Sequence, residues 1–385
     1  TSFNVDSTAA RLVEVTPVTN PTNDSTPDYT FNSSEAGTIL LGGACSSSTT
    51  SATVGNNLIT LLATADNGSL NNNTYDNCTI TVTDTSTNTV TLNISSFVVD
   101  ATTPWSQQSY VKAANSDNDS NFGASVSIDV DTIAVGATGE DSGTIAIING
   151  MTSSSNDNSS ASGAAYVYKR YGNFWVQEAY IKAANANGDN DSNFGYSVSI
   201  DGDTLAVSAI NEDSVWDNIT NGTSASDNNS SSNSGAVYVY KRTGSNWAQE
   251  AYIKASNNSA GDRFGYSVSI ENDTLVVGAY LESSDQRTIT NGTTAASTDN
   301  SMAGTGAVYV YKRSGSTWTQ QAYIKAVNSN VNDNFGRRVS LDNDTIVVGA
   351  HLEDSSETTV TNGTTAASDN DKSASGAVYV FTRNS

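Results

Sequence analysis

The chain has 385 residues, a formal net charge of −23 at pH 7 and 36% hydrophobic residues. This length is enough for two or three domains, whereas the excess of acidic residues disfavours a nucleic-acid or anionic-membrane partner, since both attract basic surfaces. No apolar run approaches membrane-spanning length, so membrane insertion is not expected. Short alternating hydrophobic runs, separated by Gly, Asn, Asp and Ser, predict an all-β protein.

The first ten residues are predicted to be a stray strand or an inter-module linker. They contain SFNVDSTA, which is similar to SFVVDATT at residues 96–103. Because the second copy is predicted to be the last strand of a folded module, the first looks like the last strand of another module. Two explanations are open: the strand is a remnant of a tandem array, or it inserts into a neighbouring subunit and satisfies open backbone groups there.

Residues 11–103 are predicted to form a small antiparallel β-sandwich, because their hydrophobic runs are short, alternating and broken by turn residues. The expected strands are residues 11–17, 28–33, 37–41, 58–65, 75–84 and 88–99. The stretches TPVTNPTNDSTPDYTFNSSEAGTI, GGACSSSTT and YDNCTITVTDTSTNTVTLNISSFVVD resemble bacterial immunoglobulin-like modules. The resemblance implies an immunoglobulin-like sandwich that acts as a spacer or an adhesive unit.

The two cysteines of the chain, Cys45 and Cys78, both lie in this segment. In an extracellular protein they are expected to form a disulfide, and closing a loop of roughly 30 residues would contribute about 3–4 kcal/mol in the chain-entropy model. The alternative is a pair of buried thiols in a reducing compartment.

Residues 104–385 contain four copies of one sequence unit. FGASVSIDVDTIAVGA, FGYSVSIDGDTLAVSA, FGYSVSIENDTLVVGA and FGRRVSLDNDTIVVGA begin at Phe122, Phe194, Phe264 and Phe335, which lie 70 to 72 residues apart. An element such as GAVYVYKR, here from Gly235, follows each copy. Repeats at one period indicate one supersecondary unit made several times. Four antiparallel strands per unit predict the blade of a β-propeller.

The last strand of the unit determines whether the propeller closes. W-x-Q-x-A-Y-I-K-A starts at Trp175, Trp247 and Trp318, but no copy follows the last GAVYVF, and a similar WSQQSYVKA starts at Trp105. If this N-terminal strand completes the last blade, four blades close into a ring without open edges. The alternative is an open arc in which residues 105–112 complete the last blade of a neighbouring subunit.

The FG and GA pairs, with Gly-Ala-Val-Tyr-Val-Tyr downstream, resemble the FG-GAP repeat of integrin-α propellers and of many bacterial surface proteins. The resemblance covers nearly all of residues 104–385. It implies a four-bladed FG-GAP β-propeller closed by the N-terminal strand. Integrin propellers normally have seven blades, so a chain with four repeats does not inherit their partner-binding surfaces. Propellers host many functions, and the fold does not define one.

Runs of oxygen-bearing side chains precede the first two FG pairs and predict metal sites. Their alternate residues are Asp117, Asp119 and Asn121 in the first repeat, and Asp189, Asp191 and Asn193 in the second. Such side chains can converge on a hard cation, and integrin-like repeats use a run of this type for Ca²⁺. These oxygen ligands make Ca²⁺ the predicted ligand, although the full integrin pattern is absent here. The alternative is a solvated turn.

A second acidic set follows each GA pair, at Glu140, Glu212, Glu282 and Glu353. Because it recurs in every repeat, a structural role, in hydrogen bonding or in binding a cation, is expected rather than catalysis. Four loops rich in Ser, Asn and Asp come next. Three of them contain Asn-Gly-Thr, a glycosylation acceptor pattern, at Asn221, Asn291 and Asn362.

Enzymatic activity is not expected. His351 is the only histidine, and it occupies a variable position of the repeat. The sequence shows no nucleophile elbow, phosphate loop or zinc-ligand spacing. The sequence therefore predicts a secreted or cell-surface structural protein that associates head to tail as a fibre subunit by strand exchange, through residues 1–10 or 104–113. The alternative is an adhesin that binds a glycan or a protein through its propeller loops.

Overall fold

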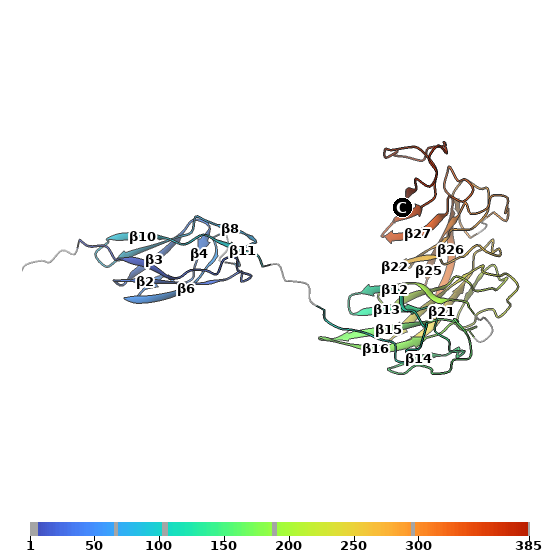
Figure 1. The fold of residues 1–385 in the computed structure, drawn as a ribbon, viewed down its shortest axis with the longest axis horizontal. Coiled ribbons are helices and arrows are strands. Elements are labelled where there is room, and N and C mark those ends of the chain that lie inside the picture. The colour runs from blue at the N-terminus through green and yellow to red at the C-terminus, as the bar shows by residue number, and fades with distance from the viewer. Residues whose placement is uncertain (1–6, 65–67, 102–106, 187–190, 294–296, 384–385) are drawn as a thin grey trace, which may run out of the picture. The chain divides into compact units, whose positions relative to one another are not determined.

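The computed structural model describes residues 7–64, 68–101, 107–186, 191–293 and 297–383. Within these residues all regular elements are β-strands, as predicted. The chain divides into two compact units, Thr1–Gln107 and Gln108–Ser385 (Figure 1). In the same described part, no helix is long and apolar enough to cross a membrane. Most of the stray strand predicted at residues 1–10 lies outside the described residues, and residues 7–10 form no strand.

The first unit contains two main antiparallel sheets. One has the order β1 (Leu12–Thr16), β2 (Asp28–Ser33), β6 (Gly55–Thr60), and the other has the order β10 (Thr89–Asn93), β9 (Thr79–Asp84), β3 (Gly37–Gly42), β5 (Ser51–Ala52). Two small sheets pair β11 (Phe97–Val99) with β8 (Asn73–Tyr75) and β4 (Cys45–Ser46) with β7 (Leu62–Ala63).

Alternation along the strands explains the core of this unit. Phe31 of β2 and Val82 of β9 belong to one buried cluster, because every second side chain of each strand points to the same side. Cys45 and Cys78 form the predicted disulfide, with Cα atoms 5.3 Å apart. The strand predicted at 88–99 is divided, since β10 and β11 belong to different sheets.

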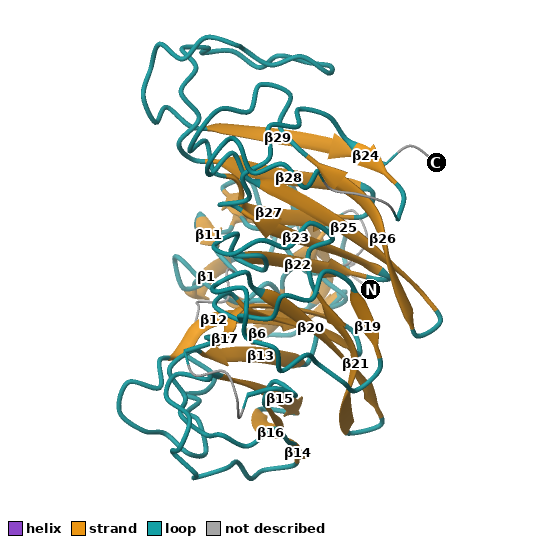
Figure 2. Cartoon of the chain, turned by 90° about the vertical axis from the view of Figure 1, so that its right-hand side faces the viewer, coloured by secondary structure: helices purple, strands orange, loops and turns teal. Residues whose placement is uncertain are grey.

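The second unit is a row of four antiparallel sheets that follow the repeats along the chain (Figure 2). The first sheet has the order β12 (Phe122–Asp129), β13 (Thr132–Ala137), β15 (Ala164–Tyr171), β16 (Phe174–Ile181), β14 (Ile147–Asn149). The second has the order β17 (Phe194–Asp201), β18 (Thr204–Ala209), β20 (Ala236–Thr243), β21 (Asn246–Ile253), β19 (Ile219–Asn221). The third has the order β22 (Ser267–Glu271), β23 (Thr274–Ala279), β25 (Ala307–Ser314), β26 (Thr317–Ile324), β24 (Thr290–Asn291). The fourth contains only β27 (Phe335–Asp342), β28 (Thr345–Ala350) and β29 (Ala377–Thr382).

Each sheet has two different faces, which explains how the row is packed. On the aromatic face, the Phe of the FG pair and two Tyr of the third strand meet edge to face; in the second sheet these are Phe194, Tyr238 and Tyr240. On the aliphatic face lie Ala, Val and Ile, such as Val167 of the first sheet. The aliphatic face of one sheet packs against the aromatic face of the next, and the two together form one core between them.

The predicted ring closure is wrong, because the sheets do not close. The fourth sheet ends at β29, and no fourth strand pairs with it among the described residues. The segment expected to supply that strand was 105–112; its described part, residues 107–112, forms no strand and lies against the first sheet. The first and fourth sheets stand at opposite ends of the row (Figure 2). A short additional strand, which the sequence did not predict, extends each of the first three sheets: β14, β19 and β24.

Candidate functional site

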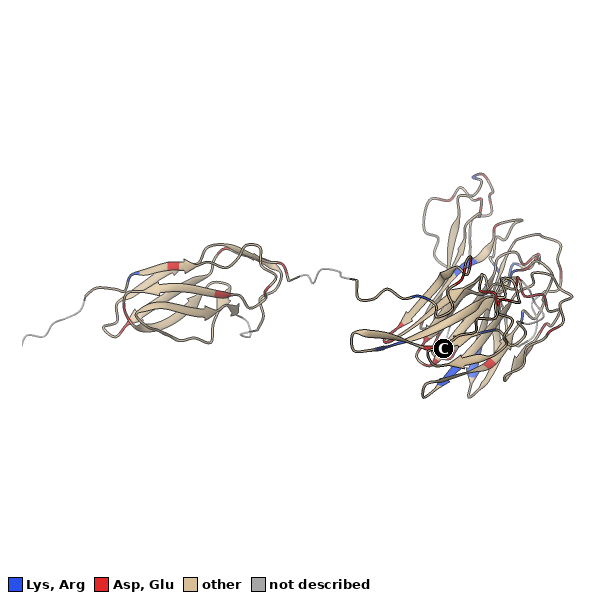
Figure 3. Cartoon of the chain, turned by 60° about the horizontal axis from the view of Figure 1, so that its bottom comes forward, with Lys and Arg blue, Asp and Glu red and all other residues tan. Residues whose placement is uncertain are grey.

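Charged side chains are scattered over the strands and loops of the second unit (Figure 3), but one group of them is buried in a cluster that recurs between repeats. In the second repeat, Glu212 accepts hydrogen bonds from Lys254 Nζ at 2.6 Å and from the Tyr252 hydroxyl at 2.7 Å. The amide of Asn185, which follows the last strand of the preceding sheet, donates to the same carboxylate at 3.1 Å. The side chains of Lys254 and Glu212 are both fully buried.

Local sequence explains why the cluster assembles. The Glu lies just after the Gly-Ala or Ser-Ala strand end, and the Lys directly follows the fourth strand of the same sheet. Glu140 pairs with Lys182 and Glu282 with Lys325 in the same way, each at 2.6 Å. A buried charge needs a partner and hydrogen bonds to offset its lost hydration. Burial lowers the pKa of the Lys182 ammonium group, while the Glu140 charge opposes that shift. The recurrent acidic set therefore has the structural role that the sequence predicted.

The fourth copy of the cluster is incomplete. Glu353 is buried, at 2% exposure. It accepts hydrogen bonds from Asn328 Nδ2 at 2.9 Å and from Ser355. Among the residues that the structure describes, no Lys or Arg forms an ion pair with it. In the other clusters the Tyr lies in the fourth strand and the Lys directly follows it, and the described part of this sheet has no such strand.

The matching Tyr and Lys lie at the other end of the row. Residues 108–115 sit on the first sheet as residues 178–185 sit on the second. Gln108 Oε1 accepts from Trp175 Nε1 at 3.1 Å, as Glu178 accepts from Trp247. The Lys112 carbonyl accepts from the Tyr168 hydroxyl at 3.0 Å, as the Lys182 carbonyl accepts from Tyr240.

The segment 108–112 therefore occupies the position of a fourth strand whose own sheet is missing. Lys112 is exposed, whereas its counterparts Lys182 and Lys254 have fully buried side chains. Tyr110 is 81% exposed, whereas its counterpart Tyr180 is fully buried. The sequence carried a signal for this cluster, because a Lys recurs in every W-x-Q element and a Glu after every GA or SA pair. The pairing of this Lys with this Glu was not predicted from the sequence.

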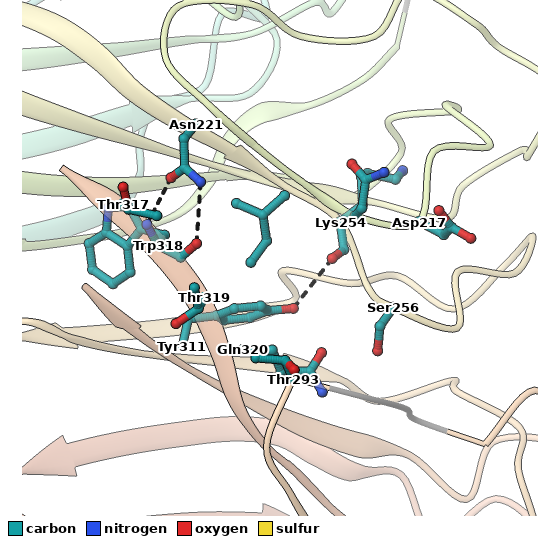
Figure 4. Close-up of a pocket in the computed structure, with 12 residues that line it drawn as sticks. Asp217, Asn221, Lys254, Ser256, Thr293, Tyr311, Thr317, Trp318, Thr319 and Gln320 are labelled. Atoms are coloured by element: carbon teal, nitrogen blue, oxygen red, sulfur yellow. Dashed lines mark hydrogen bonds between the residues drawn. The ribbon is translucent and has the colours of Figure 1, made fainter. Parts of the chain in front are cut away.

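A pocket of about 240 Å³ lies between the second and third sheets (Figure 4). Trp318 and Tyr311 line it from the third sheet, and Asn221 and Lys254 line it from the second. Asn221 Oδ1 accepts from the Trp318 backbone N–H at 2.8 Å, and Asn221 Nδ2 donates to the Trp318 carbonyl at 3.3 Å. Asn149 binds the backbone of Trp247 in the same way, so this contact is a repeated link between sheets.

That link concerns one of the three predicted glycosylation sites. The Asn221 amide nitrogen, to which a glycan would attach, already donates to Trp318. The other two candidates differ in their setting: Asn291 ends β24, and Asn362 lies in an exposed part of the fourth loop. Glycosylation at all three stays a prediction.

The predicted Ca²⁺ ligands lie in tight turns. Asp119 and Asn121 have φ values of 59° and 54°, and Asp191 and Asn193 have 64° and 55°. Asp189 lies outside the described residues, and Asp117 is exposed just before the turn at residues 118–119. Over the part of the chain that the structure describes, no group of three His, Cys, Asp or Glu side chains is arranged to hold a metal. The Ca²⁺ sites stay a prediction.

The third and fourth repeats carry a buried Asp just before the FG region. Asp262 and Asp333 occupy the position that Ser192 has in the second repeat. Burial, together with the nearby Glu282 charge, raises the pKa of Asp262 to about 8. Burial raises the pKa of Asp333 to about 6, although the Asn330 backbone N–H opposes the shift. These carboxyl groups are structural, since each binds the N–H that begins its own turn.

The fold and the buried clusters define a repeat protein. In it, the residues that follow the fourth strand of one sheet form hydrogen bonds with the next sheet. All four repeats match the FG-GAP repeat family, at residues 105–168, 175–240, 247–311 and 318–381. The chain belongs to this family. Each matched segment begins at the tryptophan of the W-x-Q element, so the family unit includes residues 105–112. A comparison with curated proteins finds no match.

Proposed function

We propose that this protein is an extracellular, non-enzymatic structural subunit of a surface fibre, whose copies associate head to tail by strand exchange. The observation that carries the proposal is that the sheet row ends in two unlike and incomplete surfaces. Within the described residues, β29 at one end pairs only with β28, and the fourth-strand segment at the other end, residues 108–112, pairs with no strand. Unlike ends make heterologous contacts, which build filaments when the rotation between subunits does not close a ring.

The first unit supports a location outside the cell. Its disulfide between Cys45 and Cys78 is of a kind that persists in oxidising compartments. The two packed sheets of this unit suit an immunoglobulin-like module. Residues 1–10 are a second candidate for strand exchange. Ca²⁺ at the Asp117 and Asp191 turns would add rigidity to the first two repeats.

Electron microscopy and light scattering of the purified full chain test this proposal. Filaments with a regular axial repeat are expected, with mass rising with protein concentration. Deleting residues 1–10 distinguishes the two strand-exchange routes, because filaments persist if residues 104–113 make the link. EDTA treatment would change filament order only if cations bind the predicted turns. A single monomeric species at every concentration tested contradicts the proposal.

The alternative function is an adhesin that binds a glycan or a protein through the propeller loops. The pocket between the second and third sheets favours it, since it offers Asp217, Ser256 and Thr293 as polar groups beside apolar surface. Glycan-array binding by a monomeric chain, lost on Thr293→Trp and retained on Thr364→Trp in the exposed fourth loop, would support the adhesin. Binding to no glycan on the array, together with filament formation, would leave the structural function as the better account.

A further inference from the structure

We propose that the surface at the end of the row binds a second copy of this chain, whose residues 108–112 pair with β29 and whose Lys112 ammonium group binds the buried Glu353 carboxylate. This inference rests on the proposed head-to-tail association and names its interface. The first sheet of one copy would then pack on the fourth sheet of another copy, as successive sheets pack within one chain.

The ion cluster is the strongest reason for this pairing. In three copies of the cluster, Lys Nζ lies 2.6 Å from the Glu carboxylate, and the Lys side chain is fully buried. In the fourth, Glu353 is buried beside Asn328 and Ser355 without an ion pair among the described residues. A buried carboxylate without a cation is strongly disfavoured. Lys112 is the lysine at the matching position of the one fourth-strand element without a sheet of its own.

Strand register gives the second reason. The third strand of each internal sheet pairs with the fourth at Ala165 and Ile181, at Val237 and Ile253, and at Val308 and Ile324. By the same register, Val378 of β29 faces Val111 of the incoming segment. An edge strand offers a row of unpaired N–H and C=O groups, and an extended segment can satisfy them by strand addition.

The two end faces are complementary because they repeat the internal ones. Val378 on the aliphatic face of the fourth sheet is 67% exposed, whereas its counterpart Val237 is fully buried. Val126 on the first strand of the first sheet is 70% exposed, whereas its counterpart Val198 is 7% exposed. Exposed apolar patches of this kind mark interaction surfaces. Docking one end on the other covers both.

Hydrogen bonds between the first strands of neighbouring sheets give a further reason for the contact. Ser127 Oγ accepts from the Ile200 N–H at 3.1 Å, and Ser199 Oγ accepts from the Ile270 N–H at 3.0 Å. Ser269 Oγ accepts from the Leu341 N–H at 3.1 Å in the same way. The last serine of this series is Ser340 on β27, whose matching donor would be the N–H of Ile128 at the start of another row. The end of the row therefore presents an acceptor where the start presents a donor.

A second copy fits better than closure within one chain. Three hydrogen-bond acceptors hold residues 108–115 on the first sheet. They are Gln108 Oε1, the Lys112 carbonyl and Asn115 Oδ1, which accepts from the Tyr166 hydroxyl at 2.6 Å. That sheet lies at the opposite end of the row from β29 (Figure 2). The segment thus already makes the contacts with the first sheet that it would make in an assembled row. The remaining contact would be its pairing with β29 of a second copy.

Cysteine cross-linking tests the interface. The native cysteines are joined to each other, so a chain with Val111→Cys and Val378→Cys carries one new reactive pair. After oxidation of the full chain, a ladder of multimers on a non-reducing gel is expected. An equal mixture of the two single variants should give cross-linked dimers of unlike chains and no longer species. Lys112→Glu in the double-cysteine chain should reduce the amount of cross-linked multimer at least tenfold. Lys241→Glu, the same charge change on an internal sheet, should leave that amount unchanged.

The outcomes separate this interface from the proposed function. A cross-linked monomer from the double variant, with no cross-link in the mixture, would overturn the inference, because the ring would then close within one chain. Filaments in the microscope without any cross-link would also overturn it, but would leave the fibre function in place through another contact. Absence of both filaments and cross-links would reject the two together. Unchanged thermal unfolding of the Lys112→Glu chain ensures that a lost ladder is not lost folding.

Discussion

Two lysines with the same place in the repeat have opposite environments, so replacing them has opposite consequences. Lys182 is buried against Glu140, whereas Lys112 is exposed. Lys182→Ala leaves a buried carboxylate without its cation and should lower the free energy of unfolding by about 3–5 kcal/mol. Lys112→Ala should change it by no more than about 0.5 kcal/mol in dilute solution. Denaturant unfolding of the two variants measures this difference, and equal losses would contradict the assignment of the fourth-strand position.

Asp262 makes the stability of the third repeat depend on pH. Its folded-state pKa is raised to about 8 by burial and by the Glu282 charge, so the folded protein holds a proton that the unfolded chain releases above about pH 4. The contribution to stability is present in full below about pH 4 and is lost as pH rises to 8, by up to about 1.4 kcal/mol per pH unit.

Asp262→Asn is therefore expected to be more stable than the native protein at pH 8 and to remove this part of the pH dependence. Thermal unfolding between pH 5 and pH 8.5 measures the slope. Ser192→Asn, at the matching position of the second repeat, serves as the control and should leave the slope unchanged. The same slope in the Asp262→Asn variant would show that other groups control it.

At the scale of the element, close approach of neighbouring sheets explains why a glycine is the penultimate residue of β23, the second strand of the third sheet. A Cβ at Gly278 would lie 1.9 Å from the Gly336 carbonyl oxygen of the next sheet. Gly349 has the same place in the fourth sheet, but the nearest atom to its Cβ would be 3.9 Å away, in ordinary contact. The difference arises because, among the residues that the structure describes, no further sheet packs on that side of the fourth one.

Gly278→Ala is expected to destabilise the second unit by about 1–3 kcal/mol, since two backbones must separate to admit the methyl group. Gly349→Ala should leave the stability of the isolated chain nearly unchanged. Thermal unfolding of the two variants under conditions that keep the chain monomeric tests the pair. A large loss in Gly349→Ala would indicate that a further sheet already packs there.

Sheet elements show how far sequence reasoning reached. The alternation of Val, Ile and Tyr located the four principal strands of each of the first three sheets and the three strands of the fourth, because the side-chain period of a strand is two. It missed β14, β19 and β24, which are two or three residues long. Strands that short are stabilised by pairing with the W-x-Q strand rather than by their own pattern. The fourth loop supports this explanation: it carries Thr361-Asn362, but without that strand it forms none.

For the whole molecule, net charge opposes association of like chains. With a charge of −23, copies repel one another at long range, and this repulsion is screened over about 10 Å at 0.1 M salt. Head-to-tail association should therefore strengthen as NaCl is raised from about 10 mM to 0.15 M, and the buried Lys112–Glu353 pair should be much less affected. Light scattering over this range measures the effect. Assembly that dissolves steadily with salt would indicate an interface held by exposed ion pairs.

Sequence by itself determined the all-β class, the four FG-GAP repeats and the disulfide between Cys45 and Cys78. Each of these depends on short patterns or on residue types that are visible along the chain. It also showed that a fourth-strand element precedes the first FG pair.

Only the tertiary structure decided where that element lies. Closure depends on the angle between successive sheets, which side-chain packing sets across residues far apart in the chain, such as Tyr238 against Val167. The same packing leaves Glu353 buried at one end of the row and Lys112 exposed at the other. A pattern read along one chain cannot fix an angle between sheets, because that angle is the sum of many contacts between distant residues.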